Sequence, residues 1–203
     1  MGSYIGTEEG KAEFIQEKNV EWEEDTKALS EIAATEPQVA YSAFIYGTSR
    51  RWLFVARTTP RVAEGLRHLD WLINETFVPA IVGKEYITDI MKDVFTLQAK
   101  QGGLGITNIS QTAELECENS LLMTEELTEL IYKQRNIMKL DEKKIEDALK
   151  IVDKRKTTYY GTKRVEIYNR MQTHEQRIID LASGKGASSW LTSFPLADFD
   201  DIS

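Results

Sequence analysis

Apolar residues recur at helical spacing in the first part of the chain, and this feature most constrains the fold. Ile15, Trp22 and Leu29 lie seven residues apart, which places them on one face of a helix that begins near residue 10. Glu36-Pro37 ends this helix, because proline cannot continue a helix but begins one well.

Prolines and capping residues also predict the helices that follow. A second helix is expected over residues 37–57. Thr58-Thr59-Pro60 combines a capping hydroxyl with a proline at a first helical position, so a third helix is expected to begin at Pro60. Thr88-Asp89 is expected to cap a short helix that runs to Leu97.

A glycine-rich stretch then interrupts the helical pattern. Gly102, Gly103 and Gly105 fall within four residues, which indicates a turn that needs positive φ or a close approach of backbone. The spacing is not that of a phosphate-binding loop, and neither is the spacing at residues 183–186. No nucleotide-binding loop is therefore expected.

The remaining segments are expected to be helical, with one strand at the start of the chain. A helix is expected beyond Asn108, and Thr124 is expected to cap another. Residues 141–181 are rich in Lys, Glu, Arg and Gln, which favours a long exposed helix or helix pair, bent near Tyr159-Tyr160-Gly161. A solvated spacer is the functionally neutral interpretation of this stretch. Residues 1–9 resemble the end of a strand followed by a turn.

The expected fold class is mainly α: a helical bundle followed by a long exposed helix or helix pair. Four parts are expected: 1–107, a helical bundle with a short N-terminal strand; 108–138, a helical extension; 139–183, a long charged linker helix; and 184–203, an incomplete C-terminal segment.

Composition excludes several classes of protein. An apolar content of 41% and a charged content of 29% describe a folded chain. A single cysteine, Cys117, cannot form an internal disulfide, and with only His68 and His174 no zinc-type spacing exists, so neither a metal nor a cofactor is expected. No apolar run is long enough for a membrane span and no secretory signal is evident, which favours an intracellular location, cytoplasmic or nuclear.

A basic island lies within this acidic chain. Residues 37–68 hold five arginines and one glutamate, a net charge of +4, although the whole chain has a net charge of −8. Arginine mixed with Trp, Tyr and Phe is typical of surfaces that bind a nucleic-acid backbone. The candidate binding residues are Arg50, Arg51, Arg57 and Arg61. A simpler interpretation remains open, in which the aromatics form a helix's core face and the arginines its solvated face.

Residues that could form a catalytic site were not found in the sequence. No Ser, Cys or Lys nucleophile lies near a histidine in a known pattern, and no metal-binding acidic signature of the Tyr-x-Asp-Asp kind is present. Enzyme activity is therefore not expected from this chain alone.

Six blocks occur in a specific order along nearly the whole chain: GSYIG (2–6), EPQVAYSAF (36–44), RWLFVARTTP (51–60), FVPAIVG (77–83), GGLGITN (102–108) and KGASSWLT (185–192). In this order they resemble the segment that follows the catalytic palm in reverse transcriptases of non-LTR-type retroelements.

The resemblance implies that residues 10–83 form the helical thumb, which grips the primer–template duplex. The first strand would lie beside the primer-grip turn, and the thumb arginines would lie along phosphates without reading the base sequence. In that family the polymerase aspartates lie upstream of Gly2, and a Cys/His-rich segment and a nuclease lie downstream of Trp190. Asp198-Phe199-Asp200-Asp201 also departs from the expected continuation.

Two functions are therefore expected. The first is a non-catalytic fragment of an RNA-directed DNA polymerase from a mobile element, which contributes duplex binding. The alternative is a free-standing helical interaction module derived from such an element, which uses residues 141–181 to bind a partner or itself.

Overall fold

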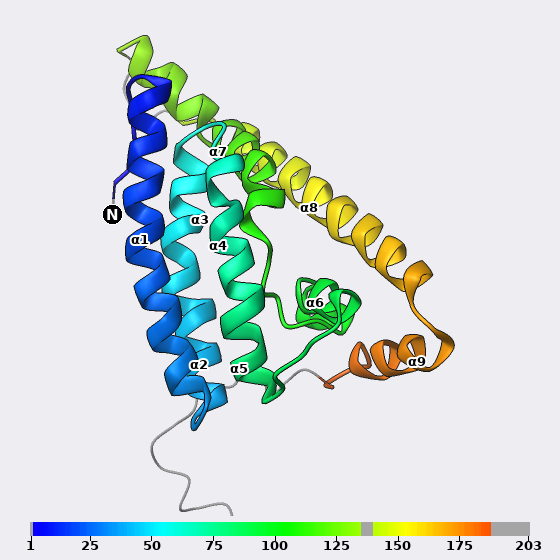
Figure 1. Ribbon diagram of the computed structural model, residues 1–203. Coiled ribbons are helices and arrows are strands. Elements are labelled where there is room, and N and C mark those ends of the chain that lie inside the picture. Colours follow the sequence, from blue (N-terminus) through cyan, green and yellow to red (C-terminus); the bar gives the residue numbers. More distant parts are fainter. Residues whose placement is uncertain (1, 135–139, 188–203) are drawn as a thin grey trace, which may run out of the picture.

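The computed structural model describes residues 2–134 and 140–187, and within these ranges it contains helices and no strands (Figure 1). The expected mainly α fold is confirmed. The main helices are α1 (Glu8–Ala33), α2 (Pro37–Ala43), α3 (Ser49–Thr58), α4 (Arg67–Leu72), α5 (Val78–Val82), α6 (Asp89–Phe95), α7 (Ile109–Tyr132), α8 (Glu142–Arg170) and α9 (Thr173–Ala182). Most of the segment 184–203, including residues 188–192 of the sixth block, lies outside the described residues.

Two predicted helix starts are confirmed. Pro37 is the first residue of α2, which continues through a π-helical turn (Phe44–Thr48) into α3. The hydroxyl of Thr88 accepts a hydrogen bond from the backbone N–H of Met91 at 3.4 Å, and α6 begins at the next residue.

The predicted start of the third helix at Pro60 is wrong. Thr59 is extended and Arg61 has a φ of 59°, so helical structure resumes only in a 3-10 turn over Glu64–Leu66. Thr59 and Val62 are buried instead, because the connection turns inward against α1. The backbone carbonyl of Pro60 accepts a hydrogen bond from Lys11 at 3.2 Å, which ties this turn to the first helix.

The expected N-terminal strand is also wrong for residues 2–5, which have no regular structure. A strand needs a partner with which to share its backbone hydrogen bonds, and the described part of the chain provides none. Tyr4 instead stacks on Phe14 of α1 at 5.8 Å and donates its N–H to the hydroxyl of Thr59.

Two expected interruptions in the later helices do not occur. Thr124 lies inside α7, where its hydroxyl donates back to the carbonyl of Ser120 at 2.9 Å instead of capping a new helix. Helix α8 runs through Gly161 as one element, and the chain turns only at Met171-Gln172, before α9.

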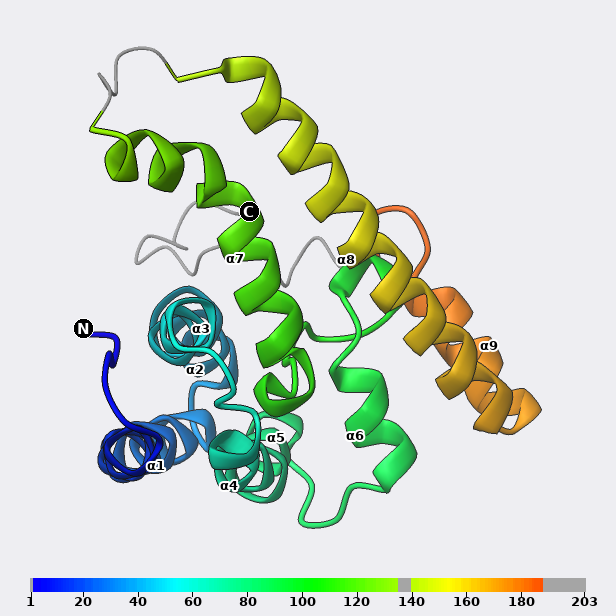
Figure 2. The same ribbon diagram turned by 90° about the horizontal axis from the view of Figure 1, so that it is seen from above.

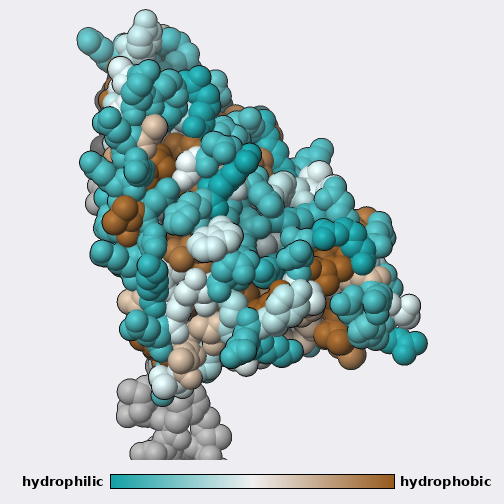
Figure 3. Space-filling model, viewed as in Figure 1, coloured by the Kyte–Doolittle hydropathy of each residue, from teal (hydrophilic) through white to brown (hydrophobic). Residues whose placement is uncertain are grey.

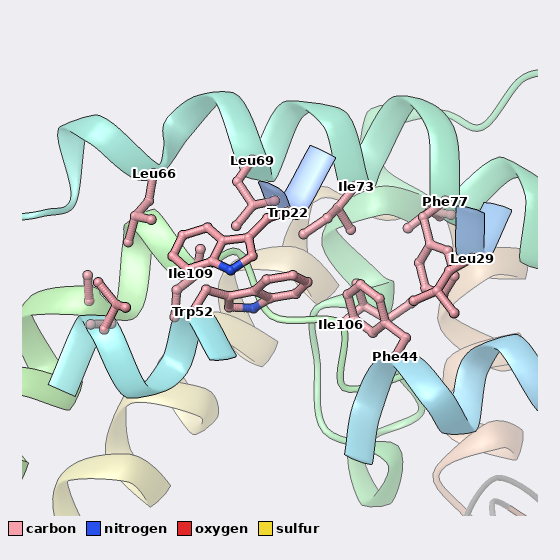
Figure 4. Packing of buried hydrophobic residues seen from close by; sticks show 14 of the residues in the cluster. Trp22, Leu29, Phe44, Trp52, Leu66, Leu69, Ile73, Phe77, Ile106 and Ile109 are labelled. Carbon is pink, nitrogen blue, oxygen red and sulfur yellow. The ribbon is translucent and has the colours of Figure 1, made fainter. Parts of the chain in front are cut away.

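The main core lies between α1 and the helices from α2 to α5, and it also takes in the start of α7 (Figure 4). The indole of Trp22 meets that of Trp52 edge-on at 6.0 Å, and Phe44 stacks on Phe77 at 4.3 Å. Aromatic pairs of this kind contribute beyond the area they bury. The core thus extends past residue 107, because Ile109 and Ala113 belong to it.

Helix α7 lies between α3 and α8, so the bundle and the long basic helix meet across it (Figure 2). A second, smaller core joins α6, α8 and α9 through Val94, Leu97, Ile167, Met171 and Ile179. The C-terminal half of α8 is therefore packed against the protein and is not a bare spacer. The side of the molecule seen in Figure 1 is mostly hydrophilic, with apolar side chains in small separate groups (Figure 3).

A carboxylate from a helix that is distant in sequence holds the start of α7. Asp70 of α4 accepts hydrogen bonds from the backbone N–H groups of Ile109 at 2.6 Å and Ser110 at 3.0 Å. These N–H groups have no partner within the helix itself. Burial raises the pKa of Asp70, although these hydrogen bonds act in the opposite direction.

The predicted glycine turn is confirmed. Gly102 and Gly105 have φ values of 90° and 70°, which side chains with a Cβ rarely adopt. Gly103 is needed for a different reason, because a Cβ there would lie 2.2 Å from the carbonyl oxygen of Leu97. After the turn the backbone N–H of Ile106 donates to the carbonyl of Phe95 in α6 at 3.0 Å, and the hydroxyl of Thr107 lies 3.4 Å from that of Tyr160 in α8.

Candidate nucleic-acid interface

Two of the four candidate arginines face the acidic helix α1. Arg51 forms ion pairs with Glu21 and Asp25, and Arg61 pairs with Glu8 through Nη2 and Oε1 at 2.6 Å. Their charges are thus already balanced within the protein. These two residues hold α3 and the following turn against α1.

The other two candidates lie on a different side of α3. Arg50 and Arg57 are seven residues apart, which is two helical turns, so they share one face. The Nε of Arg57 donates to Oε2 of Glu116 at 2.9 Å. Arg50 is exposed, and no acidic partner is found for it among the described residues. The four arginines therefore do not form one surface.

Glu116 connects three helices. Besides the contact with Arg57 of α3, its Oε1 lies 2.7 Å from the Nζ of Lys156 on α8. Burial opposes ionisation of Glu116, but the hydrogen bonds from Lys156 and Arg57 outweigh it and lower its pKa. The carboxylate is therefore charged at neutral pH and shared by two cations.

These groups surround a cavity of about 230 Å³, which we call the basic hollow and define by Arg50, Arg57, Lys156 and Glu116. Three cations meet one carboxylate there, which leaves the hollow with a positive charge. Its walls come from α3, α7, α8 and the glycine turn, and its other lining residues include Ser49, Gln98, Gly105, Thr107 and Tyr160.

The glycine turn fastens α8 over the basic hollow. The hydroxyls of Thr107 and Tyr160 lie 3.4 Å apart, and the side chain of Gln101 donates to the carbonyl of Tyr160 at 3.3 Å. Tyr160 is one helical turn after Lys156, so these contacts set the position of the lysine. The glycine turn therefore also helps to shape the candidate site.

The interpretation of the sequence missed the contribution of α8. Between Lys154 and Arg170 the chain has six basic residues and one acidic residue, a signal that a count by window would have found. Most of these cations have partners, because Arg164 pairs with Asp180 and Arg170 with Asp93. Lys156 is the residue of this group that lines the basic hollow.

Acidification should weaken the connection made by Glu116. A carboxyl whose pKa is lowered by folding stabilises the protein above its ordinary pKa of 4.5, and this contribution is lost as the pH falls through the lowered value. We expect Glu116→Gln to cost about 1 kcal/mol at pH 7. The difference in the free energy of unfolding between wild type and Glu116→Gln should shrink as the pH falls below 4.5.

The measurement is urea unfolding of both proteins across pH 3 to 7, followed by circular dichroism. Glu118→Gln is the matched control, because Glu118 is on the same helix but exposed, with its nearest cation 4.0 Å away. A difference in unfolding free energy between wild type and Glu116→Gln that stays constant with pH would contradict the lowered pKa assigned to Glu116.

The described residues also show neither a metal site nor a membrane span. In residues 2–134 and 140–187, no group of three or more His, Cys, Asp or Glu side chains is arranged to hold a metal ion. None of the helices in these ranges is both long and apolar enough to span a membrane.

Comparison with known proteins also found no relative. No family model matches the chain, and no curated protein and no solved structure matches it.

Proposed function

We propose that this chain is a non-catalytic segment of an RNA-directed DNA polymerase of the non-LTR retroelement type, and that it holds the backbone of the primer–template duplex at the basic hollow. The observation that carries the proposal is the charge of this hollow. Arg50, Arg57 and Lys156 meet a single carboxylate, and Arg50 has no acidic partner in the described part of the chain. The six ordered sequence blocks supply the polymerase context.

The chemistry of the basic hollow suits a phosphodiester. A guanidinium offers donors in a planar fork that matches two phosphate oxygens, and the ammonium of Lys156 adds a compact charge. Such contacts position a duplex without reading its sequence. The shape of the duplex, and not its bases, would decide binding.

The acidic balance of the whole chain sets the strength of this interaction. With a net charge of −8, long-range attraction to a polyanion is absent, so only local contacts contribute. About two phosphate contacts would give a shallow dependence of binding on salt, with a slope near −2 in a plot of log K against log salt concentration. Binding should therefore be weak and supported by the rest of a larger polymerase.

The test is fluorescence anisotropy of a labelled, blunt RNA/DNA hybrid at several salt concentrations. We expect Arg50→Ala to weaken binding about fivefold at low salt and to reduce the magnitude of the salt slope by about 1, because one phosphate contact is lost. Arg50 is exposed, so its replacement should leave stability unchanged.

Arg177→Ala is the matched control. It removes the same charge from an exposed arginine of α9 that does not line the basic hollow. Equal affinity of wild type and Arg50→Ala at every salt concentration would refute the proposal. An equal loss in both variants would show that net charge, and not this hollow, governs binding.

A second candidate function is a helical interaction module that self-associates, and one observation favours it. Leu121, Ile131 and Tyr132 are exposed on α7, and an open groove of about 550 Å³ lies beside Leu121 and Tyr132. Exposed apolar patches often mark protein–protein contacts. Sedimentation separates the candidates, since a chain that stays monomeric at all concentrations gives no support to the module.

A further inference from the structure

The basic hollow is too small to take a length of strand. Its volume of about 230 Å³ lies below the roughly 300 to 1,000 Å³ of pockets that enclose a drug-sized molecule. Residues of three helices and of the glycine turn surround this space. A phosphate in the middle of a strand is joined to a nucleotide on both sides and cannot go deep into such a space, whereas a phosphate at a strand end can.

The charged groups lie at different depths in the basic hollow. The side chain of Glu116 is 10% exposed and that of Lys156 is 29% exposed, whereas Arg50 is an exposed residue. Arg57 pairs with Glu116 through Nε, and no hydrogen bond from its two Nη groups is found within the described residues. Arg50 can therefore meet a strand that passes the rim, while Arg57 and Lys156 can hold a group that enters.

The charge of the basic hollow exceeds that of a backbone phosphate. Glu116 is the one acidic residue among the described residues that line it, so its three cations leave a net charge of +2. A phosphodiester carries a single negative charge, whereas a terminal phosphate monoester carries about −1.5 to −2 at pH 7, because its second pKa is about 6. The monoester therefore balances the charge of the hollow more closely than the diester does.

Two hydroxyls of the basic hollow add a neutral donor. Those of Thr107 and Tyr160 share one hydrogen bond at 3.4 Å, and whichever of them accepts it keeps its own proton free to donate. Burial raises the pKa of Tyr160, so its hydroxyl stays protonated at neutral pH. Both residues line the hollow together with Lys156, and this donor is therefore available to a phosphate oxygen.

We propose that the basic hollow takes the terminal phosphate monoester of a nucleic-acid strand, whose oxygens contact Arg57 and Lys156. This inference rests on the proposed function, because the ligand is the same duplex, and it adds that a strand end is bound. Arg50 remains at the rim, where it contacts the backbone next to that end. A free mononucleotide carries the same phosphate monoester, and a competition assay separates the two sources.

The experiment compares two labelled, blunt RNA/DNA hybrids that differ only in a 5′-phosphate on the DNA strand. Fluorescence anisotropy should show about tenfold tighter binding of the phosphorylated hybrid, which is the effect of about one charge-assisted hydrogen bond. At about pH 5.5 the monoester is mainly a monoanion, so this advantage should shrink. Glu116 stays ionised at that pH because its pKa is lowered, and the hollow itself keeps its charge.

Lys156→Ala should remove most of the advantage of the 5′-phosphate. Lys154→Ala is the matched control, since it removes the same charge from an exposed position of the same helix outside the hollow. Lys156 also pairs with Glu116, so the readout is the ratio of the affinities of one variant for the two hybrids. A general loss of structure would weaken binding of both hybrids alike, whereas a lost phosphate contact weakens binding of the phosphorylated hybrid alone.

Equal affinity of wild type for the two hybrids would overturn this inference, and the proposed function would stand if Arg50→Ala still weakened binding of both. Thymidine 5′-monophosphate should compete less well than unlabelled phosphorylated hybrid, because it lacks the backbone that Arg50 contacts. Equal competition would also overturn the inference, since the hollow would then bind a free nucleotide. If Arg50→Ala binds both hybrids as wild type does and the 5′-phosphate still tightens binding, the proposed function fails and the terminal-phosphate site stands.

Discussion

Replacing Trp52 with alanine should lower the free energy of unfolding by about 4 kcal/mol, since a large side chain is removed from the centre of a packed core. Trp52 contacts Trp22 of α1 edge-on, and its ring centre lies 5.5 Å from that of Phe44 (Figure 4). It therefore connects the first helix to the segment that carries the arginines. Urea denaturation followed by circular dichroism measures the loss.

Phe54→Ala is the control for this substitution. Phe54 lies on the same helix but is 39% exposed, so its removal should cost less than about 1 kcal/mol. Similar losses of stability in Trp52→Ala and Phe54→Ala would mean that α3 does not bury the face that carries Trp52. The arginines could then not be assigned to opposite sides of it.

Replacing Gly103 with alanine should cost about 3 kcal/mol, because the added methyl group meets backbone and not a movable side chain. The new Cβ would lie 2.2 Å from the carbonyl oxygen of Leu97 and 2.5 Å from that of Val94. The turn must open to relieve this contact, and Gly105 and Thr107 would leave the wall of the basic hollow. The variant should therefore also bind the RNA/DNA hybrid more weakly.

Gly161→Ala is the control for this substitution, and its expected effect on stability has the opposite sign. Gly161 lies inside α8, and an added Cβ there meets nothing within 4 Å. Alanine should stabilise the helix by about 0.5 to 1 kcal/mol, because glycine loses more backbone entropy on folding. Thermal unfolding gives both values, and a Gly103→Ala variant as stable as wild type would contradict the packing of the turn.

Local signals in the sequence predicted much of the fold. Pro37, Thr88 and the glycine turn were placed correctly, because each acts through backbone geometry within a few residues. The helix start predicted at Pro60 is wrong, since burial of Thr59 and Val62 decides the path of the chain there. The bend expected near Gly161 was wrong because α8 packs along its length against α7 and α6.

The candidate site could be predicted only in part. A count of charges identified the arginines but could not say which would be neutralised. Arg51 and Asp25 are 26 residues apart in sequence, and Arg57 and Glu116 are 59 apart, so these pairs exist only after packing. Lys156 reaches the basic hollow for the same reason, because α8 meets Glu116 of α7 only after packing.

The assignment of the arginines can be tested directly by nuclear magnetic resonance, following the arginine Nε–Hε signals while an RNA/DNA hybrid is added. The account predicts that the signals of Arg50 and Arg57 shift with increasing hybrid, because they face the basic hollow. The signal of Arg51 should stay unchanged, since it remains paired with Glu21 and Asp25. Shifts of Arg51 and Arg61 without shifts of Arg50 and Arg57 would contradict the central claim.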